Sequence, residues 1–171
     1  MRPRADEIID SVVKTFEQYV VPEVEDPYAK SLSLTMANLM RLVKQQIEHE
    51  GPLLYADIED LRSTLTEVRA YLGSQTELGE RFAVQIADLD RVLAEPSFLP
   101  DVYPTLAAVG REVDRLKWAL QHALIALDRA RPDLGDAADY QAIRTRVRQY
   151  LRRSIEREGQ LVLPAFTGER R

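Results

Sequence analysis

Residues 105–131 are expected to form one helix, and a single face of this helix carries side chains that could bind an anion or a partner. That face holds the only tryptophan of the chain and one of its two histidines, with arginines on either side. Spacings of three and four bring these residues together. An indole, an imidazole and guanidiniums can hold a phosphate or carboxylate beside an apolar group. The face consists of Arg111, Arg115, Trp118, His122, Ile125 and Arg129.

The opposite face of the same helix is an apolar stripe, typical of a helix packed in a bundle. Because that stripe already serves the core, something else must cover Trp118. We expect an interface between copies of the chain, with Trp118 and Ile125 as anchors and Arg115 and Arg129 setting the register. The alternative is a ligand site in which the arginines and His122 bind an anion. The stripe consists of Leu106, Val109, Val113, Leu116, Leu120, Ala123 and Leu127.

Asn38, Gln45 and His49 form a polar row near the end of an expected second helix. With the carboxylates that follow, such a row could hold a metal ion or a polar substrate. A di-iron site is not expected, because Gln46 stands where a Glu-x-x-His pair needs its glutamate. Two histidines are also too few for a His-rich zinc site. We expect an ordinary boundary row with a histidine near a helix end, and no bound metal.

The expected last helix is rich in arginine. Nucleic acid or acidic phospholipid would neutralise such a helix in a salt-dependent way. The aromatic side chains that interleave with arginines in RNA-binding proteins are limited here to Tyr140 and Tyr150. We expect the arginines to pair with acidic residues of earlier helices or of a partner, and nucleic-acid or membrane-surface binding is the weaker alternative. The set is Arg144, Arg146, Arg148, Arg152, Arg153 and Arg157.

Sequence patterns of common catalytic sites are missing. The seven glycines form no phosphate-binding loop, and neither a Gly-x-Ser-x-Gly nor a His-Glu-x-x-His motif occurs. The chain has no cysteine, which excludes disulfides, thiolate catalysis and Cys-ligated zinc or iron–sulfur sites. Two carboxylates could still converge for acid–base catalysis, but nothing nominates a pair. We therefore expect no catalytic residue and no cofactor.

The composition is that of a globular protein, with 45% hydrophobic and 30% charged residues. The net charge of −5 is unevenly placed: residues 1–128 hold 13 Lys and Arg against 22 Asp and Glu, whereas residues 129–171 hold 10 against 6. An acidic balance argues against a dedicated DNA-binding protein. No run approaches the ~20 apolar residues of a membrane helix, and the residues from Met1 to Glu7 lack the apolar core of a signal peptide. We expect a cytoplasmic protein.

Apolar periodicity and helix punctuation predict an all-α bundle of about six antiparallel helices in a single domain, 1–171. Asp26 as N-cap and Pro27 at the first helical position mark the start of the second helix. Residues 159–171 carry five apolar side chains and are expected to dock as an apolar C-terminal tail. The helices are expected at 6–20, 27–50, 52–72, 75–95, 105–131 and 137–158.

Core faces are expected on each of these helices. Gly51-Pro52 is expected to stop the second helix, and the proline-rich but apolar break at 96–104 is expected to pack down as a strap. The first two core faces consist of Ile8, Ile9, Val12, Val13, Phe16 and Val20, then Leu32, Met36, Leu39, Met40, Val43 and Ile47. The last consists of Tyr140, Ile143, Val147, Leu151 and Ile155.

The first third of the chain resembles an uncharacterised bacterial helical family. The shared features are Arg2-Pro3, Glu7-Ile8-Ile9, Val20-Val21-Pro22, and the stretch from Met36-Ala37-Asn38 to Glu50-Gly51-Pro52. The resemblance covers residues 2–54. Members of that family are often encoded beside aminoglycoside-phosphotransferase-like kinases and acyl-CoA dehydrogenases. The resemblance implies an accessory role near such chemistry and transfers no catalytic residue.

These observations predict a non-enzymatic accessory or protein-interaction module with a possible partner enzyme. It is expected to be a homodimer through the Trp118 face, the C-terminal tail, or both. The alternative is a binder of, or an enzyme acting on, an anionic small molecule such as an acyl-CoA or a phosphorylated metabolite.

Overall fold

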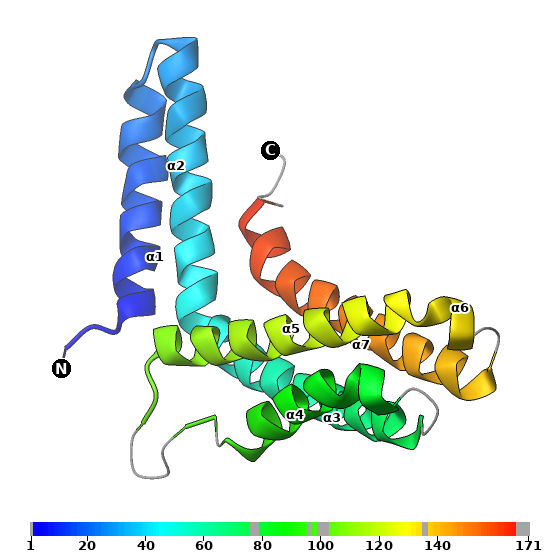
Figure 1. The fold of residues 1–171 in the computed structure, drawn as a ribbon. Coiled ribbons are helices and arrows are strands. Elements are labelled where there is room, and N and C mark those ends of the chain that lie inside the picture. The colour runs from blue at the N-terminus through cyan, green and yellow to red at the C-terminus, as the bar shows by residue number, and fades with distance from the viewer. Residues whose placement is uncertain (1, 76–78, 96, 99–102, 135–136, 167–171) are drawn as a thin grey trace. The chain divides into compact units, whose positions relative to one another are not determined.

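Every regular element of this computed structural model is helical, across residues 2–75, 79–95, 97–98, 103–134 and 137–166, which are the residues that the structure describes (Figure 1). The prediction of an all-α bundle is therefore confirmed. The elements are α1 (Ala5–Thr15), the π-helical η1 (Phe16–Val20), the 3₁₀-helical η2 (Val21–Glu23), α2 (Pro27–Gln45), the π-helical η3 (Gln46–Glu50), α3 (Gly51–Ser74), α4 (Gly79–Ala94), α5 (Leu106–Arg129), α6 (Arg131–Leu134) and α7 (Ala138–Phe166).

The described residues divide into two compact units, although a single domain was expected. The four-helix unit comprises residues 54–154, and the hairpin unit comprises residues 2–53 together with 155–166. The chain passes from one unit to the other within α3 and again within α7. Each unit therefore has its own packing.

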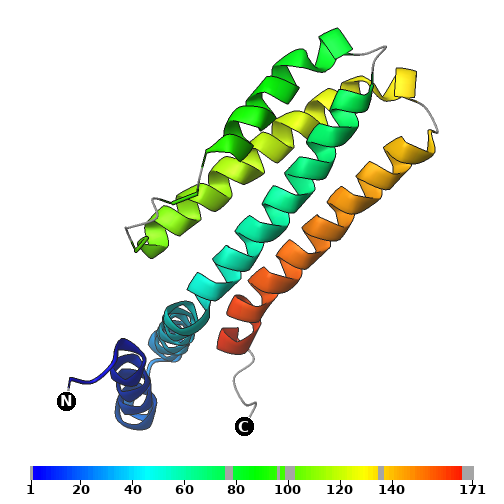
Figure 2. The same ribbon diagram turned by 90° about the horizontal axis from the view of Figure 1, so that it is seen from below.

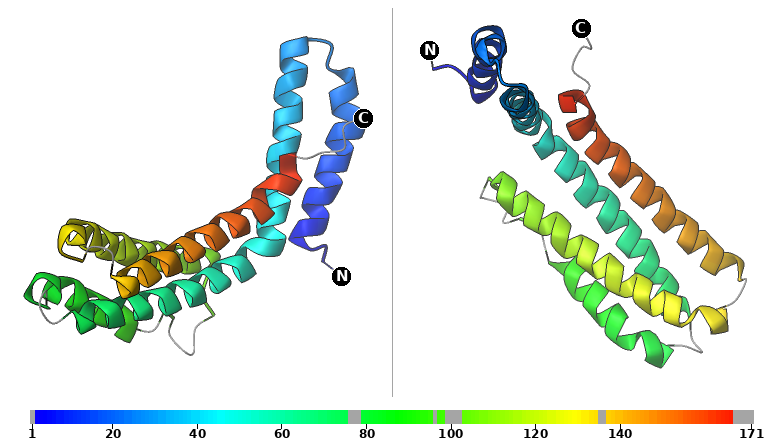
Figure 3. Two further views of the ribbon diagram at one scale, coloured as in Figure 1. Left: turned by 90° about the vertical axis from the view of Figure 1, so that its right-hand side faces the viewer. Right: turned by 90° about the horizontal axis from the view of Figure 1, so that it is seen from above.

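The four-helix unit runs up, down, up and down along α3, α4, α5 and the first part of α7 (Figures 2 and 3). Short connections between antiparallel neighbours are the usual topology of such bundles. The start of α5 is fixed by Thr105, whose hydroxyl accepts a hydrogen bond from the Ala108 amide at 3.2 Å. The expected start of α4 at residue 75 precedes residues 76–78, which lie outside the described residues; α4 begins at Gly79.

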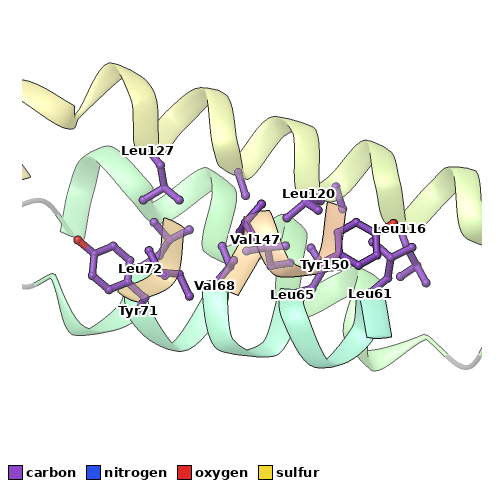
Figure 4. Close-up of a cluster of buried hydrophobic side chains, with 14 of the residues drawn as sticks. Leu61, Leu65, Val68, Tyr71, Leu72, Leu116, Leu120, Leu127, Val147 and Tyr150 are labelled. Atoms are coloured by element: carbon purple, nitrogen blue, oxygen red, sulfur yellow. The ribbon is translucent and has the colours of Figure 1, made fainter. Parts of the chain in front are cut away.

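Apolar residues at helical spacing fill the centre of this unit (Figure 4). The expected stripe of α5 is buried except for Leu106, and Leu61, Leu65 and Val68 of α3 lie opposite it with no exposed surface. On α7 the buried stripe includes Tyr150, whereas the expected Leu151 is exposed. Alternating steps of three and four residues lead from Tyr140 to residues 143, 147 and 150, which all face the core. The expected stripe took a step of four after Val147 and therefore reached Leu151, which lies off the core face.

The hairpin unit holds α1 and α2 side by side (Figure 1). The predicted cap of α2 is confirmed, because the Asp26 carboxylate accepts a 2.8 Å hydrogen bond from the Ala29 amide and Pro27 stands at the first helical position. Ala29, Ser33 and Ala37 follow at intervals of four, and Ala37 is fully buried. Small side chains at this spacing let two helices approach closely.

Ion pairs join α2 to α1 and to η1. Lys44 Nζ lies 2.9 Å from Asp10 Oδ1 of α1, and Arg41 pairs with Glu17 of η1. Lys14 adds a second cation to the Asp10 carboxylate at 2.7 Å. Arg41 and Lys44 of α2 thus lie on the side that faces α1 and η1.

The outer face of the hairpin departs from the sequence prediction. The residues expected to form core faces on α1 and α2 are largely exposed, including Val12, Leu39 and Met36, the last with 54% of its surface accessible. Only Val13 of the expected α1 set is buried. The sequence pattern indicated correctly that this face is apolar, but most of its side chains are exposed.

Two expected helix ends are also different in the structure. Gly51 has right-handed helical angles (φ −54°, ψ −60°), and the backbone continues through η3 into α3 without a stop. Gly159 likewise does not end the last helix, which continues to Phe166. Of the expected tail, residues 159–166 are therefore helical and mostly exposed, with Ala165 buried, and residues 167–171 lie outside the described residues.

The break at 96–104 is described in part. Phe98 packs against Tyr55 in an edge-on contact, with ring centroids 5.7 Å apart, whereas Tyr103 is 96% exposed. Residues 96 and 99–102 lie outside the described residues. Across the helices that the structure describes, none combines the length and the apolar character needed to cross a membrane.

Candidate functional site

A groove of about 610 Å³ lies between α4 and α5, and the predicted Trp118 face forms one of its walls. Arg111, Arg115, Trp118 and His122 all line it. The opposite wall comes from α4, through apolar residues that include Val84, Leu89 and Val92. The structure therefore brings together four of the six residues that the sequence assigned to this face.

Ile125 and Arg129 are the two members of the predicted face that do not line the groove. They lie further along α5, where Ile125 is 42% exposed and Arg129 is also exposed. The predicted face is therefore longer than the groove, and its far end is open surface.

Trp118 and His122 stack on each other in the groove wall. Their ring centroids lie 3.7 Å apart, with the planes inclined by 31°. The four-residue spacing on one helix produces this contact directly. Trp118 nevertheless remains 60% exposed, so the stack is a surface available for contact and not a core element.

The charges around the groove largely neutralise each other. Arg115 donates two hydrogen bonds to Glu112, at 2.8 and 2.9 Å, and a third to Glu95 at 2.7 Å. Arg91 lies 3.3 Å from Asp88 on the same helix. An arginine whose guanidinium already makes a bidentate pair with a carboxylate has little capacity left for an external anion. The geometry of Arg115 therefore does not support its predicted role in binding an anion.

Glu112 is the centre of a buried network behind the groove. It accepts hydrogen bonds from Ser97 at 2.7 Å and from Arg62 at 3.2 Å, besides those from Arg115. Burial raises the pKa of this carboxyl, but the hydrogen bonds from Arg115, Ser97 and Arg62 outweigh it and hold the pKa below its usual range. Arg62 also donates to the carbonyl oxygens of Leu93 and Glu95, so the network fixes the end of α4.

Sequence reasoning missed Glu112 and Arg62. The sequence did contain a signal for this network, because a glutamate stands directly before Val113 of the apolar α5 stripe. A charged side chain that is buried beside such a stripe needs a partner of opposite charge. The wall contributed by α4 was also missed, because periodicity does not show which helices become neighbours. One α4 residue there, Gln85, has a buried Oε1 with no hydrogen-bond partner among the described residues.

The predicted polar row on α2 does not form a site in the structure. Asn38 Oδ1 accepts a 2.8 Å hydrogen bond from Arg41, and His49 is half-exposed with Nε2 3.6 Å from Glu48. Since η3 begins at Gln46, the π-helical turn places His49 off a strict α-helical row with Gln45. Among the described residues, no three His, Asp or Glu side chains are grouped so that they could hold a metal ion.

Two arginines of α7 are engaged with α3. Arg153 holds Asp60 through two hydrogen bonds, at 2.8 and 2.7 Å, and Arg146 lies 2.8 Å from Glu67 and 3.4 Å from Asp60. Pairing with an earlier acidic helix, which the sequence favoured, is therefore present for both arginines. Arg144 lies over the Tyr140 ring, 5.6 Å from its centroid. These contacts use the arginines to hold the bundle together.

Comparison of the chain with protein-family models, with curated proteins and with solved structures finds no match in any of the three.

Proposed function

We propose that this protein is a non-enzymatic interaction module that associates with further copies of itself. The observation that carries the proposal is the apolar outer face of the α1–α2 hairpin. Leu32, Met36 and Leu39 each expose about half of their surface there, at 48%, 54% and 50%. Monomeric proteins rarely leave a contiguous apolar surface of this kind open to water, because burying it is favourable.

The state of the carboxylates supports a non-enzymatic role. Glu112, a buried acid that pairs with the groove residue Arg115, is held ionised by two arginines and a serine. A general acid or base needs a pKa near the working pH, whereas this environment lowers the pKa of a carboxyl. The resemblance of residues 2–54 to an uncharacterised helical family, often encoded beside aminoglycoside-phosphotransferase-like kinases and acyl-CoA dehydrogenases, implies an accessory role and suggests a partner enzyme.

Sedimentation velocity over a dilution series tests the proposal. We expect a reversible dimer whose fraction falls on dilution. A chain that sediments as a monomer at the highest concentration would contradict the proposed function. Trp118→Ala, measured in the same series, reports whether the groove face takes part in that association.

A second candidate function is the binding of an anionic small molecule in the α4–α5 groove. Its volume of about 610 Å³ falls within the range of roughly 300–1,000 Å³ typical of small-molecule sites. Arg111 lines the groove and has no ion pair among the described residues, and the unpartnered Gln85 Oε1 offers an acceptor. Trp118 would cover the apolar part of such a ligand.

The single tryptophan makes this second candidate directly measurable. We would titrate an acyl-CoA, and separately inorganic phosphate, while following Trp118 emission. A saturable shift that Arg111→Ala removes and Arg129→Ala retains would support a site in the groove, because Arg129 lies outside it. An unchanged spectrum with both compounds would refute this candidate without affecting the first.

A further inference from the structure

The α2 helix places its charges toward its neighbour and its apolar residues toward solvent. Arg41 pairs with Glu17 of η1, and Lys44 pairs with Asp10 of α1. From Ser31 to Met40, ten consecutive residues carry no charge at all. An ordinary surface hairpin does the opposite, with its apolar residues between the helices and its charges outside. This inverted arrangement leaves apolar side chains in water, so covering the outer face would be favourable.

The outer face of α2 is an apolar stripe of six large residues, which we call the α2 stripe. Five of these residues lie on α2, where about 100° of rotation per residue puts them within a strip roughly 80° wide, and the sixth, Ile47, follows in η3. Their exposed fractions run from 42% to 73%. The α2 stripe consists of Tyr28, Leu32, Met36, Leu39, Val43 and Ile47.

The spacing within the α2 stripe is the same from either end. Its intervals are four, four, three, four and four residues. Two antiparallel helices related by a two-fold axis place residue i opposite a fixed partner j, and residue j opposite i. A palindromic spacing lets every member of the stripe meet another member, because each pair adds to 75: Tyr28 with Ile47, Leu32 with Val43, and Met36 with Leu39.

We propose that the partner covering the α2 stripe is the α2 stripe of a second copy, packed antiparallel about a two-fold axis between residues 37 and 38. The inference rests on the proposed self-association and adds the surface and the geometry to it. Ile8 and Val12 of α1 are also exposed, at 48% and 45%, and extend the apolar area of the hairpin.

The area of the α2 stripe is sufficient for a stable dimer. A large side chain has on the order of 200 Å² of accessible surface, and about half of it is exposed in each of the six residues. Two copies would therefore remove roughly 1,200 Å² from water, which reaches the lower end of the standard interface size.

The charge distribution also favours a second copy of the α2 stripe as the partner. Beside the middle of the stripe, residues such as Ser33, Thr35 and Leu42 are uncharged, so they would cause no repulsion between identical surfaces there.

Leu39→Asp tests the interface, and Leu34→Asp is its matched control. Leu34 lies on the same helix and is equally exposed, at 49% against 50% for Leu39, but five positions of rotation turn it about 140° away from Leu39, outside the α2 stripe. Both changes carry the same cost in helix propensity. We expect the wild type and Leu34→Asp to sediment as dimers, and Leu39→Asp as a monomer with unchanged far-UV circular dichroism. A dimeric Leu39→Asp would overturn the pairing.

Cysteine pairing tests the geometry without disturbing the fold, since the chain has no cysteine of its own. We would mix Leu32→Cys with Val43→Cys under mild oxidation. In the antiparallel pair Leu32 lies opposite Val43, whereas two copies of Leu32 lie about 16 Å apart along the axis, too far for a disulfide. A cross-linked product should form from the mixture and not from either variant alone. A product from Leu32→Cys alone would indicate a parallel pair and overturn the proposal.

The remaining outcomes separate this inference from the proposed function. A wild type that is monomeric at every concentration contradicts both. A dimer that Trp118→Ala dissociates and Leu39→Asp does not would retain the proposed function and overturn the α2 pairing. A monomer in which Leu39→Cys is protected from a thiol reagent would show that another segment of the same chain covers the stripe, and would also overturn the pairing.

Discussion

Glu112 shows how a single buried acid can hold several elements. It accepts hydrogen bonds from Arg115 on its own helix, Arg62 on α3 and Ser97 after α4. Replacing it with Gln keeps the volume but leaves two arginines without their counter-charge. We expect Glu112→Gln to lower the free energy of unfolding by about 1–3 kcal/mol at neutral pH, measured by urea denaturation. Asp114→Asn, an exposed change on the same helix, should have little effect.

The contribution of ionised Glu112 to stability should also be visible in the pH dependence of unfolding. Because the folded pKa of Glu112 lies below its ordinary value of about 4.5, its contribution is fully present above that pH and is lost as the pH falls through the folded pKa. Thermal unfolding between neutral pH and pH 3 should therefore show a smaller acid loss in Glu112→Gln than in the wild type. Parallel curves for the two proteins would show that Glu112 is not held ionised by its neighbours.

Tyr71 is a buried phenol whose hydroxyl has no hydrogen-bond partner among the described residues. Burial, with smaller contributions from Asp139 and Tyr140, raises its pKa to about 12. Tyr71→Phe removes an unsatisfied polar atom and keeps the ring. We therefore expect urea denaturation to show unchanged stability, or a gain of up to about 1 kcal/mol. A loss larger than that would mean that the hydroxyl has a partner in solution.

High pH gives a second readout for Tyr71. A raised folded pKa means that stability is fully present below pH 10 and declines as the pH rises toward 12. That decline should be smaller in Tyr71→Phe than in Tyr103→Phe, since Tyr103 is almost fully exposed. Equal declines would contradict the assignment.

At the level of elements, Asp10 connects the two helices of the hairpin. Hydrogen bonds from Lys14 and Lys44 lower the pKa of its carboxyl to about 2. This contribution to the hairpin is present above the ordinary pKa near 3.8 and is lost as the pH falls through about 2. In Asp10→Asn we expect faster amide exchange in α1 and α2 at neutral pH. Exchange in α4 and α5 should stay at the wild-type rate, and an equal change there would refute a local role.

Much of the element structure could be predicted, because helix type depends on local periodicity. The Asp26 cap, the α5 stripe and the apolar outer row of α2 all follow from spacing along the chain. The spacing of residues shows that one face of a helix is apolar, but it does not show what covers that face. The apolar face of α2 was therefore expected to belong to the core. Gly51 and Gly159 were expected to end helices, yet glycine ends a helix only where the backbone leaves the right-handed region, and Gly51 does not.

The candidate groove could be predicted only on one side. The four-residue step from Trp118 to His122 is a property of α5 alone and was visible in the sequence. The wall from α4 and the pairing of Arg115 with Glu95 depend on which helices lie side by side. Arg115 and Glu95 are 20 residues apart in the chain. Such tertiary pairings leave no periodic trace in one sequence.

For the whole molecule, the division into two units predicts separable stability. Leu65 has no exposed surface in the core of the four-helix unit. Leu65→Ala should cost about 2–5 kcal/mol there through lost burial and a cavity. We expect hydrogen exchange to accelerate in α3, α4 and α5, while α2 keeps its wild-type rates. Uniform acceleration throughout the chain would show that the two units unfold as one.

The uncharged run from Ser31 to Met40 also matters during synthesis of the protein. It is translated before α3, α4 and α5, so for a time it has neither charges to repel other chains nor a finished partner. Sequences usually place charged residues beside such apolar stretches to prevent aggregation. In this chain Lys30 and Arg41 stand at the two ends of the run, and the helical hairpin adds to their protection by folding early enough to present a rigid helix face in place of an extended apolar strand. The speed of hairpin formation would then limit how fast the chain can be produced without aggregating.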